Sequence, residues 1–212
     1  MRHMAFDRPL LRRTGGLTFW RLLGTGRGRS MSLGADLRRW ALFAVWREEA
    51  DLEAFLRESP IAARWRAEAA ERWQVRLAPL ASRGTWGGRD PFPQGGVRQG
   101  GDGPVAVLTR ASIRARRLAA FYRSVPPVDR LLARQDGCLA SVGIGEWPLA
   151  RQATFSLWRD AAAMRRFAYG DDEHLRVVAR VRADGWYSEE LFARFIPYGS
   201  EGAWNGSDPL TS

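Results

Sequence analysis

The sequence predicts an α+β fold in which two copies of a ferredoxin-like unit form one α+β barrel. Three observations favour this fold: sequence blocks recur in one order, both copies show a similar succession of strands and helices, and a Gly- and Pro-rich stretch separates them. We expect a first, N-terminally incomplete unit at 1–82, a linker at 83–103 and a second unit at 104–212. Together the three segments would make one structural domain.

The internal repeat consists of four blocks that recur 112 to 119 residues further along the chain. The pairs are VWREEADLEAF (45–55) with LWRDAAAMRRF (157–167), GTWGGRDPF (84–92) with GAWNGSDPL (202–210), LLGTG (22–26) with SVGIG (141–145), and Trp73 with Trp186. Because chance rarely preserves the order of four blocks, we infer a duplication.

The second copy begins with a strand and a long helix. Residues 104–113 (PVAVLTRASI) are branched and apolar, which favours a strand. Residues 115–135 carry apolar side chains at helical spacing, and Pro126 and Pro127 predict a break within this helix.

The rest of the second copy completes the order β-α-β-β-α-β, which is that of a ferredoxin-like unit. The remaining elements are strands at 138–145 and 152–158, a helix that ends at Phe167, a helix at roughly 172–183 and a strand at 188–198. Polar and apolar residues alternate along 152–158, as in a strand with one buried face. Asp160 is a typical N-cap for the helix that follows it.

The first copy follows the same order but lacks its beginning. It shows strands at 17–23, 39–46 and 73–80 and helices at 48–57 and 60–72. The opening strand and most of the matching helix are missing, and residues 5–13 (AFDRPLLRR) match only the end of that helix. Two explanations stay open: this half is naturally shortened, or the start codon was chosen too late.

Composition excludes several classes of protein. The 212 residues have globular proportions of apolar and charged residues, and the lone Cys138 excludes a disulfide framework and a multi-thiolate metal site. No apolar run is long enough to cross a membrane and no signal peptide is evident, so we expect a cytoplasmic protein. The net charge is +10, and all 33 basic residues are arginine. This surplus reflects either acidic partners or a composition bias.

Several motifs together resemble the spheroidene monooxygenase family, whose members introduce a keto group at the C2 end of acyclic carotenoids. The motifs are GLTFWRLLGTGRG (16–28), PVAVLTRASIR (104–114), GIGEWP (143–148), QATFSLW (152–158) and, most specifically, GWYSEELFARF (185–195). The resemblance runs from about residue 10 to the C-terminus. The chain departs from the family pattern in its shorter N-terminus, which lacks the first strand.

The resemblance implies a fold of the dimeric α+β barrel type and an oxygen-dependent monooxygenase with a haem b cofactor. It further implies O2 and a hydrophobic isoprenoid as substrates. The sequence shows no flavin or nicotinamide signature, so we expect an external electron donor such as a ferredoxin, which would fit the basic charge. A lipophilic substrate also leaves room for peripheral contact with a membrane.

A haem requires an axial ligand of the His, Cys, Met or Tyr type. His174 lies near the start of the helix expected at 172–183, and its counterpart in the first copy is Ile61. With the resemblance, we predict that His174 binds the iron, although a lone helical histidine is otherwise often structural. His3 lies close to the chain start. Cys138 is the competing ligand, and ordinary core packing explains it better.

The remaining candidate residues come from the strands of the second copy and from its aromatic side chains. Arg110 interrupts an apolar strand, so we predict that it meets a haem propionate or lies on the oxygen side, with Arg194 as a weaker second. A buried ion pair of Arg110 with Glu146, Glu189 or Glu190 is the equally weighted alternative. The other predicted cofactor or substrate contacts are Thr154, Ser156, Tyr169, Trp186, Phe155 and Phe192. The aromatic residues among them are alternatively plain core.

Other functions are less well supported. A small-ligand carrier or a cofactor-independent oxygenase with the same barrel is the main alternative. We expect no nucleic-acid partner, because the middle strands lack the aromatic pattern of RNA-binding sheets. GTGRG (24–28) does not open a helix, so it does not predict a nucleotide-binding loop. Residues 171–173 (DDE) are better explained as a helix N-terminus than as a metal site.

Overall fold

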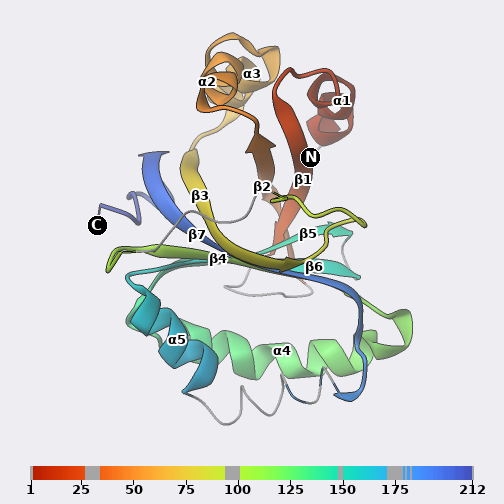
Figure 1. Ribbon diagram of the computed structural model, residues 1–212. Coiled ribbons are helices and arrows are strands. Elements are labelled where there is room, and N and C mark those ends of the chain that lie inside the picture. The colour runs from red at the N-terminus through yellow and green to blue at the C-terminus, as the bar shows by residue number, and fades with distance from the viewer. Residues whose placement is uncertain are drawn as a thin grey trace.

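The computed structural model describes residues 2–26, 34–93, 101–147, 150–170, 179, 181 and 183–211. A curled antiparallel sheet forms the middle of the molecule, with α1, α2 and α3 at one end and α4 and α5 on the opposite side (Figure 1). Within the described residues, no helix is long and apolar enough to span a membrane.

The first unit contains three helices and three strands. In chain order these are α1 (Arg2–Leu11), β1 (Leu17–Gly26), β2 (Ala35–Trp46), α2 (Glu49–Glu58), α3 (Pro60–Glu68) and β3 (Trp73–Gly84). Helix α1 corresponds to the fragment expected at 5–13, and the side chain of Asp7 fixes it to α3. That carboxylate is buried, pairs with Arg64 and accepts a hydrogen bond from Nε1 of Trp65 at 3.1 Å.

In its described residues, the second unit follows the expected order of elements. In chain order these are β4 (Val105–Ile113), the short 3₁₀ helix η1 (Ala115–Arg117), α4 (Leu118–Ala133), β5 (Cys138–Trp147), β6 (Arg151–Trp158), α5 (Ala161–Tyr169) and β7 (Tyr187–Gly202). The predicted N-cap is confirmed, because Asp160 accepts a hydrogen bond from the backbone N–H of Ala163 at 2.6 Å. The helix expected at 172–183 lies mostly outside the described residues.

The break predicted at the two prolines is wrong. Helix α4 continues through Pro126 and Pro127, although neither residue can donate a backbone hydrogen bond. On either side of the prolines the helix is held by buried apolar contacts, through Phe121 with Trp186 and through Leu132 with Trp158. This packing outweighs the local cost of the prolines.

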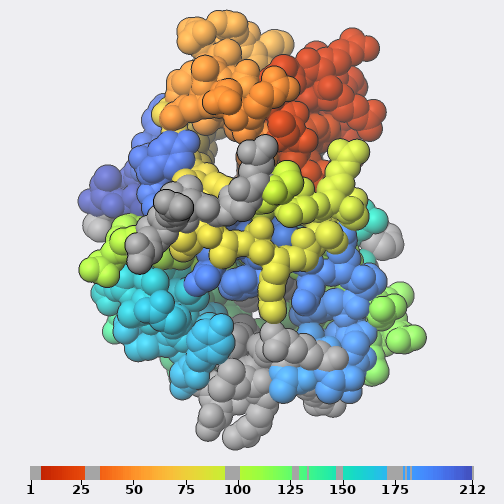
Figure 2. Space-filling view, in the orientation of Figure 1, coloured from red at the N-terminus to blue at the C-terminus, as the bar shows by residue number. Residues whose placement is uncertain are grey.

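The order of the strands confirms two ferredoxin-like units that share one barrel. The sheet runs β2-β1-β5-β6-β4-β7-β3, and the four strands of the second unit have the ferredoxin-like order within it. The units are joined twice, where β1 meets β5 at Gly24 and Gly145 and where β3 pairs with β7 along its length. In the second unit, β4 lies between β6 and β7. The corresponding place in the first unit is between β2 and β3, and no strand of the described part of the chain lies there. Figure 2 shows a hollow there, below α2 and α3.

The repeated loop motif has the same backbone geometry in both units. Gly84 and Gly202 have φ angles of 91° and 90°, and the next residue in each case donates a hydrogen bond of 2.8 Å, to the carbonyls of Glu190 and Arg72. The correspondence of Trp73 with Trp186 is weaker. Trp73 begins β3 and faces the barrel interior, whereas Trp186 precedes β7 and packs under α4.

Candidate functional site

Each strand has one face toward the barrel interior and one toward the helices. Along β4, Ala106 and Leu108 belong to the interior cluster that contains Phe19, Phe195 and Trp86. Val107, on the other face, packs against Met164 of α5. In the interior, aromatic rings pack against one another around Trp86 and Phe195.

The helix-covered face of the first unit is filled with large side chains. Its buried cluster and the partly buried residues against it are Leu11, Leu17, Trp20, Leu22, Leu42, Trp46, Phe55, Leu56, Ile61, Ala62 and Trp65. Three of its rings pack closely, with Phe55 at 5.2 Å from Trp46 and 6.3 Å from Trp65 between centroids. Ile61, the counterpart of His174, is 1% exposed within this cluster. The first unit therefore serves stability on this face.

The same face of the second unit is open and polar. Thr109 is exposed although β4 is a central strand, while its chain neighbours Leu108 and Arg110 are 0% and 2% exposed on the other face. Its cross-strand partners, Thr154 on β6 and Phe192 on β7, are partly exposed. Among the described residues, this part of the sheet is therefore accessible to water on the side that faces the helices, and we refer to the space above it as the cleft.

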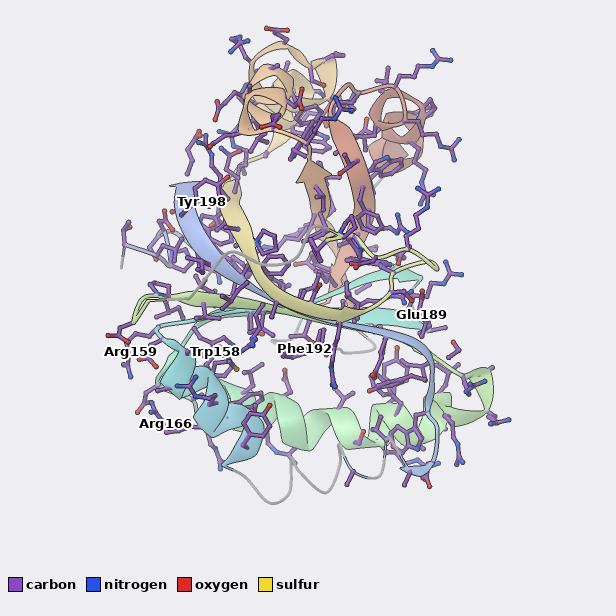
Figure 3. All side chains as sticks on the ribbon, in the orientation of Figure 1. Trp158, Arg159, Arg166, Glu189, Phe192 and Tyr198 are labelled. Carbon is purple, nitrogen blue, oxygen red and sulfur yellow. The ribbon has the colours of Figure 1, made fainter. Side chains whose placement is uncertain are left out.

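The cleft lies between two apolar clusters that hold the helices on the sheet. One cluster joins Val107 and Trp158 to α5, and the other joins Ile113 to Phe121 at the start of α4. Between them the floor carries Thr109, Ser141 and Thr154, which we call the hydroxyl floor. Phe192 lies beside it on β7 (Figure 3).

The repeat shows that this polarity distinguishes the two units. Aligned through Trp46 and Trp158, Thr154 corresponds to Leu42, and within the LLGTG and SVGIG blocks Ser141 corresponds to Leu22. Both leucines contribute to the filled face of the first unit. Apolar side chains that seal one unit are thus replaced by hydroxyls in the other.

One wall of the cleft is formed by Tyr122 of α4. Its phenol hydrogen-bonds the side chain of Gln152, which is 6% exposed on β6. Burial raises the pKa of Tyr122 and outweighs the opposite effect of this hydrogen bond. The phenol is therefore neutral at physiological pH and can donate or accept a hydrogen bond.

Arg110 lies on the opposite face of the sheet from the hydroxyl floor. It is paired with Glu189 and lies 3.8 Å from Glu146, and its guanidinium is 5.9 Å from the ring of Trp86 in the barrel interior. The alternative of a buried ion pair is confirmed. The sequence placed Arg110 and Thr154 in one pocket, but period-two alternation puts them on different faces, because Arg110 pairs in register with Ala153.

The carboxylates around Arg110 hold the loop that follows β3. Glu189 accepts hydrogen bonds from the hydroxyl of Thr85 at 2.9 Å and the backbone N–H of Gly88 at 2.7 Å. Burial alone would raise the pKa of Glu189, but its hydrogen bonds from Gly88, Arg110 and Thr85 bring the pKa to about 2. Glu146 similarly binds Nε1 of Trp86 and lies 3.3 Å from Arg21.

The other predicted contacts are scattered. Ser156 faces the helices but is buried, and it accepts a hydrogen bond from Nε1 of Trp158 at 2.9 Å. Trp186 is buried under α4 and bonds Asp184, whereas Tyr169 at the end of α5 is 71% exposed. The structure does not bring Tyr169 and Trp186 together.

The two aromatic candidates Phe155 and Phe192 lie on opposite faces of the sheet. Phe155 faces the barrel interior, 6.5 Å from the ring of Trp73, while Phe192 faces the helices. Arg194, on the same face of β7 as Phe192, is partly buried. Cys138 is 9% exposed in the cluster under α5, which agrees with core packing.

The two histidines are described only in part. His3 lies in α1, and His174 lies outside the described residues. Among the described residues, no cluster of three or more His, Cys, Asp or Glu side chains has the geometry of a metal site.

Sequence reasoning missed Thr109, Ser141, Tyr122 and Gln152. The apolar strand at 104–113 drew attention to its charged residue, Arg110, rather than to the neighbouring hydroxyl. The signal was present in the alternation, which puts Thr109 and Thr154 on one face. It needed the register of β4 and β6 to become visible.

The fold is that of a duplicated α+β barrel, with one helix-covered face filled by apolar side chains and the other carrying hydroxyls that water can reach. Three curated proteins are similar to the chain, and all are named spheroidene monooxygenase. The protein of Rhodobacter capsulatus is 40% identical over 92% of this chain and 81% of its own length. That of Rubrivivax gelatinosus is 37% identical over 90% of this chain and 73% of its own length. That of Cereibacter sphaeroides is 36% identical over 91% of this chain, which spans only 59% of that protein.

The chain belongs to the spheroidene monooxygenase family, and it is an oxygen-dependent monooxygenase. No family model matches the sequence. Among solved structures, putative monooxygenases from Fusobacterium nucleatum and Lactobacillus acidophilus are similar, each with 9% identity. The Fusobacterium nucleatum structure has a TM-score of 0.46 and covers 97% of this chain and 88% of its own length. The Lactobacillus acidophilus structure has a TM-score of 0.42 and covers 92% of this chain and 89% of its own length.

Proposed function

We propose that the enzyme is a haem-dependent monooxygenase that oxidises a hydrophobic, acyclic isoprenoid in the cleft of the second unit. The observation that carries this proposal is the exposure of Thr109 on a central strand. The described part of the first unit lacks the strand equivalent to β4, but on the strands that both units have, Leu22 and Leu42 of the first unit correspond to Ser141 and Thr154 of the second. This difference supports a ligand site in the second unit.

Haem is proposed because protein side chains alone do not supply one-electron oxygen chemistry. Haem brings four nitrogen ligands of its own, so the protein needs to add only an axial ligand, for which we propose His174. Phe192 would give such a group an apolar contact, and Thr109, Ser141 and Thr154 would place hydroxyls beside it. When bound, the haem would supply the activation of O2.

The residues of the cleft would then have distinct tasks. The hydroxyl floor would donate hydrogen bonds to oxygen held above the sheet, and Phe192 would contact the apolar chain of the substrate. Tyr122, fixed by Gln152, would limit the cleft on the side of α4. The proposed isoprenoid substrate follows the name of the three relatives, which refers to the carotenoid spheroidene.

The test uses the full chain expressed with a haem precursor and purified. We expect a Soret absorption band and, with reductant and O2, one atom of 18O from 18O2 in an oxidised acyclic carotenoid. The His174→Ala variant should lose the Soret band, whereas His3→Ala should keep it.

Two results would contradict the proposal. Full oxidation by protein free of haem and metals would instead indicate a cofactor-independent oxygenase in the same barrel. Unchanged haem binding in His174→Ala, with the fold intact by circular dichroism, would remove that residue as the ligand.

A further inference from the structure

Helix α4 carries a carboxylate, that of Asp129, on the side that faces the sheet. Near the start of the helix, the ring of Phe121 contacts the first residue of β7, with 6.3 Å between the ring centroids. The phenol of the next residue, Tyr122, bonds Gln152 of β6. The sheet therefore lies between the directions of these two side chains. Since an α-helix turns by about 100° per residue, the side chain of Asp129 points between the same two directions.

Two contacts also place Asp129 along the cleft. Tyr122 lies over Gln152, and Leu132, further along α4, packs in the apolar cluster that contains Trp158. Helix α4 and strand β6 therefore run in the same direction between these two contacts. Because Asp129 lies between them on the helix and the hydroxyl floor lies between them on the sheet, the carboxylate is on the opposite side of the cleft from the floor.

The carboxylate of Asp129 is enclosed without being satisfied. Its Oδ1 atom is fully buried and accepts no hydrogen bond, and it is the one carboxylate oxygen of the described residues in this state. Asp7, the buried carboxylate of the first unit, is by contrast held by Arg64 and Trp65. The residue Asp129 as a whole is partly exposed, so bulk water also reaches it. A buried polar atom without a partner is unusual and calls for an explanation other than stability.

We infer that Asp129 is a proton-relay residue of the cleft, an inference that rests on the proposed function. Insertion of one oxygen atom follows RH + O2 + 2e⁻ + 2H⁺ → ROH + H2O, with the electrons taken from a one-electron reductant. The second atom of O2 leaves as water and must receive two protons. The Asp129 carboxyl releases a proton through a hydroxyl of the floor to that oxygen atom, and the carboxylate regains a proton from bulk water.

Other ionisable groups around the cleft are less suited to this task. Tyr122 keeps its proton, because burial raises the pKa of its phenol. Glu189 lies on the opposite face of the sheet, where it is paired with Arg110. Glu190 of β7 is exposed. Among the described residues, Asp129 alone combines an enclosed, unbonded carboxylate oxygen with a place across from the hydroxyl floor.

The experiment compares Asp129→Asn and Asp129→Glu with the unaltered full chain, each purified with its cofactor. Carotenoid oxidation is measured with O2 and reductant and, separately, with H2O2, which brings both protons with it: RH + H2O2 → ROH + H2O. We expect Asp129→Asn to lower the O2-dependent rate about tenfold or more and to use more reductant per product, while the H2O2-dependent rate stays nearly unchanged. Asp129→Glu should restore part of the O2-dependent rate.

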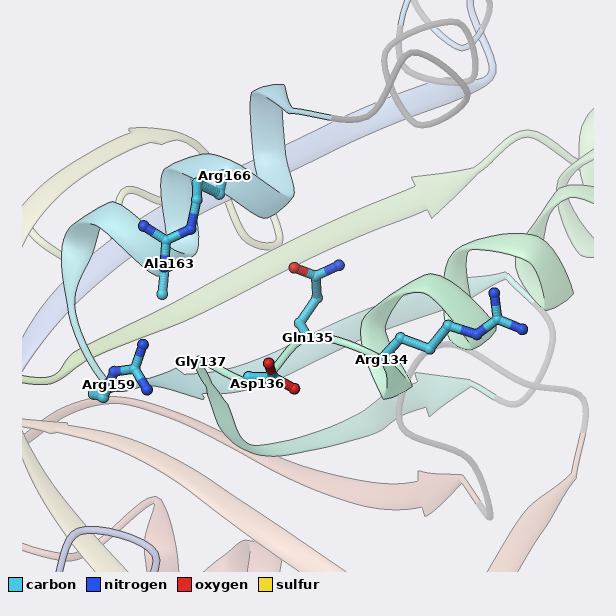
Figure 4. Close-up of a pocket in the computed structure, with 7 residues that line it drawn as sticks. All are labelled: Arg134, Gln135, Asp136, Gly137, Arg159, Ala163 and Arg166. Atoms are coloured by element: carbon cyan, nitrogen blue, oxygen red, sulfur yellow. The ribbon is translucent and has the colours of Figure 1, made fainter.

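A second measurement, urea unfolding, uses the protein free of cofactor. Asp129→Asn should leave the midpoint unchanged or raise it, because the buried oxygen accepts no hydrogen bond and a negative charge near the C-terminal end of α4 opposes the helix dipole. The matched control is Asp136→Asn. That exposed carboxylate belongs to a surface pocket of about 210 Å³ just beyond α4, lined also by Arg134, Arg159 and Arg166 (Figure 4). The control should change neither the rates nor the midpoint.

Three results would overturn the inference. An unchanged O2-dependent rate in Asp129→Asn would show that protons reach the oxygen by another route. A fall of both rates by the same factor would assign Asp129 to substrate binding, and a lower midpoint of unfolding would assign it to structure. Absence of haem from the active enzyme would contradict the proposed function instead, and the comparison of the two oxidants would still report on Asp129.

Discussion

At the scale of single residues, the contacts of Arg110 indicate a structural role and not a catalytic one. Its guanidinium is 2% exposed and lies among Glu189, Glu146 and the ring of Trp86, away from the cleft. We expect Arg110→Met to lower the free energy of unfolding by about 2–3 kcal/mol, below the usual cost of breaking a fully buried pair because both carboxylates keep some contact with water.

Urea unfolding measures this loss, and the double variant Arg110→Met/Glu189→Gln should recover part of it. A neutral glutamine no longer needs a counter-charge and still accepts hydrogen bonds from Thr85 and Gly88. Folded Arg110→Met should retain haem binding. Loss of the Soret band in a fully folded variant would instead indicate that Arg110 contributes to haem binding.

The lowered pKa of Glu189 predicts how the free energy of unfolding depends on pH. Its pKa in the folded protein is about 2, below its ordinary value of 4.5, so the folded state holds this proton less tightly than the unfolded chain. The stabilisation is therefore fully present above about pH 4.5 and is lost as the pH falls toward 2. Unfolding curves between pH 5 and 2 should be less steeply pH-dependent in Glu189→Gln. Identical slopes in the two proteins would show that other groups cause the acid sensitivity.

At the scale of elements, the repeated loop motif depends on two glycines. A Cβ atom at Gly84 would overlap the carbonyl oxygen of Glu190, and one at Gly202 would overlap that of Arg72. Both residues are also in the left-handed region, which alone costs about 1–3 kcal/mol for alanine. Gly84→Ala and Gly202→Ala should each lose at least this much in chemical unfolding.

Gly199→Ala is the matched control within β7. Its nearest contact would be the Cδ atom of Arg76 at 3.6 Å, an ordinary van der Waals distance. We expect a change of less than about 0.5 kcal/mol there. If all three variants lost the same stability, the cause would lie in strand propensity and not in the shared loop geometry.

The two free edges of the sheet should differ from its centre in hydrogen exchange. Within the described residues, β2 pairs only with β1 and β3 only with β7, whereas β4 is bonded to β6 and β7 along its length. Alternate amides of β2 and β3 should therefore exchange rapidly, while those of β4 stay protected. NMR-detected exchange resolves this alternation. Uniform protection along β2 or β3 would mean that another segment covers that edge.

The elements of the fold could largely be predicted from the sequence, because local patterns and the repeat agreed. The strand at 152–158 and the cap at Asp160 depend on neighbouring residues only, and both are confirmed. The strand is buried on both faces, however, since Gln152 and Ser156 are as little exposed as their apolar neighbours. The path of α4 through Pro126 and Pro127 could not be predicted, since distant packing of Phe121 and Leu132 decides it. Arg110 was recognised as unusual, but its partners lie on other strands.

At the scale of the whole molecule, the two units differ in how their helix-covered faces are filled. One unit has become a sealed support, in which Trp46, Phe55 and Trp65 fill the space under the helices. The other has the additional strand β4 and the long helix α4, and it presents hydroxyls on the corresponding face. The sequence placed the function in the second copy through His174 and Ile61. The hydroxyl floor supports that assignment independently of the histidine.

This division can be tested by exchanging the residues that distinguish the two faces. Thr154→Leu gives the second unit the residue of the first, and Leu42→Thr makes the reverse change. Thr154→Leu should leave stability unchanged or higher, because it adds apolar contact, yet reduce oxidation of the carotenoid at least tenfold by filling the cleft. Leu42→Thr should lower the free energy of unfolding by about 1–2 kcal/mol from lost burial and leave the activity of the folded protein intact.

Assays of unfolding and turnover on both variants are required, since only opposite effects in the two units fit one sealed half and one open half. A loss of activity in Leu42→Thr without unfolding would mean that both halves contribute to the site.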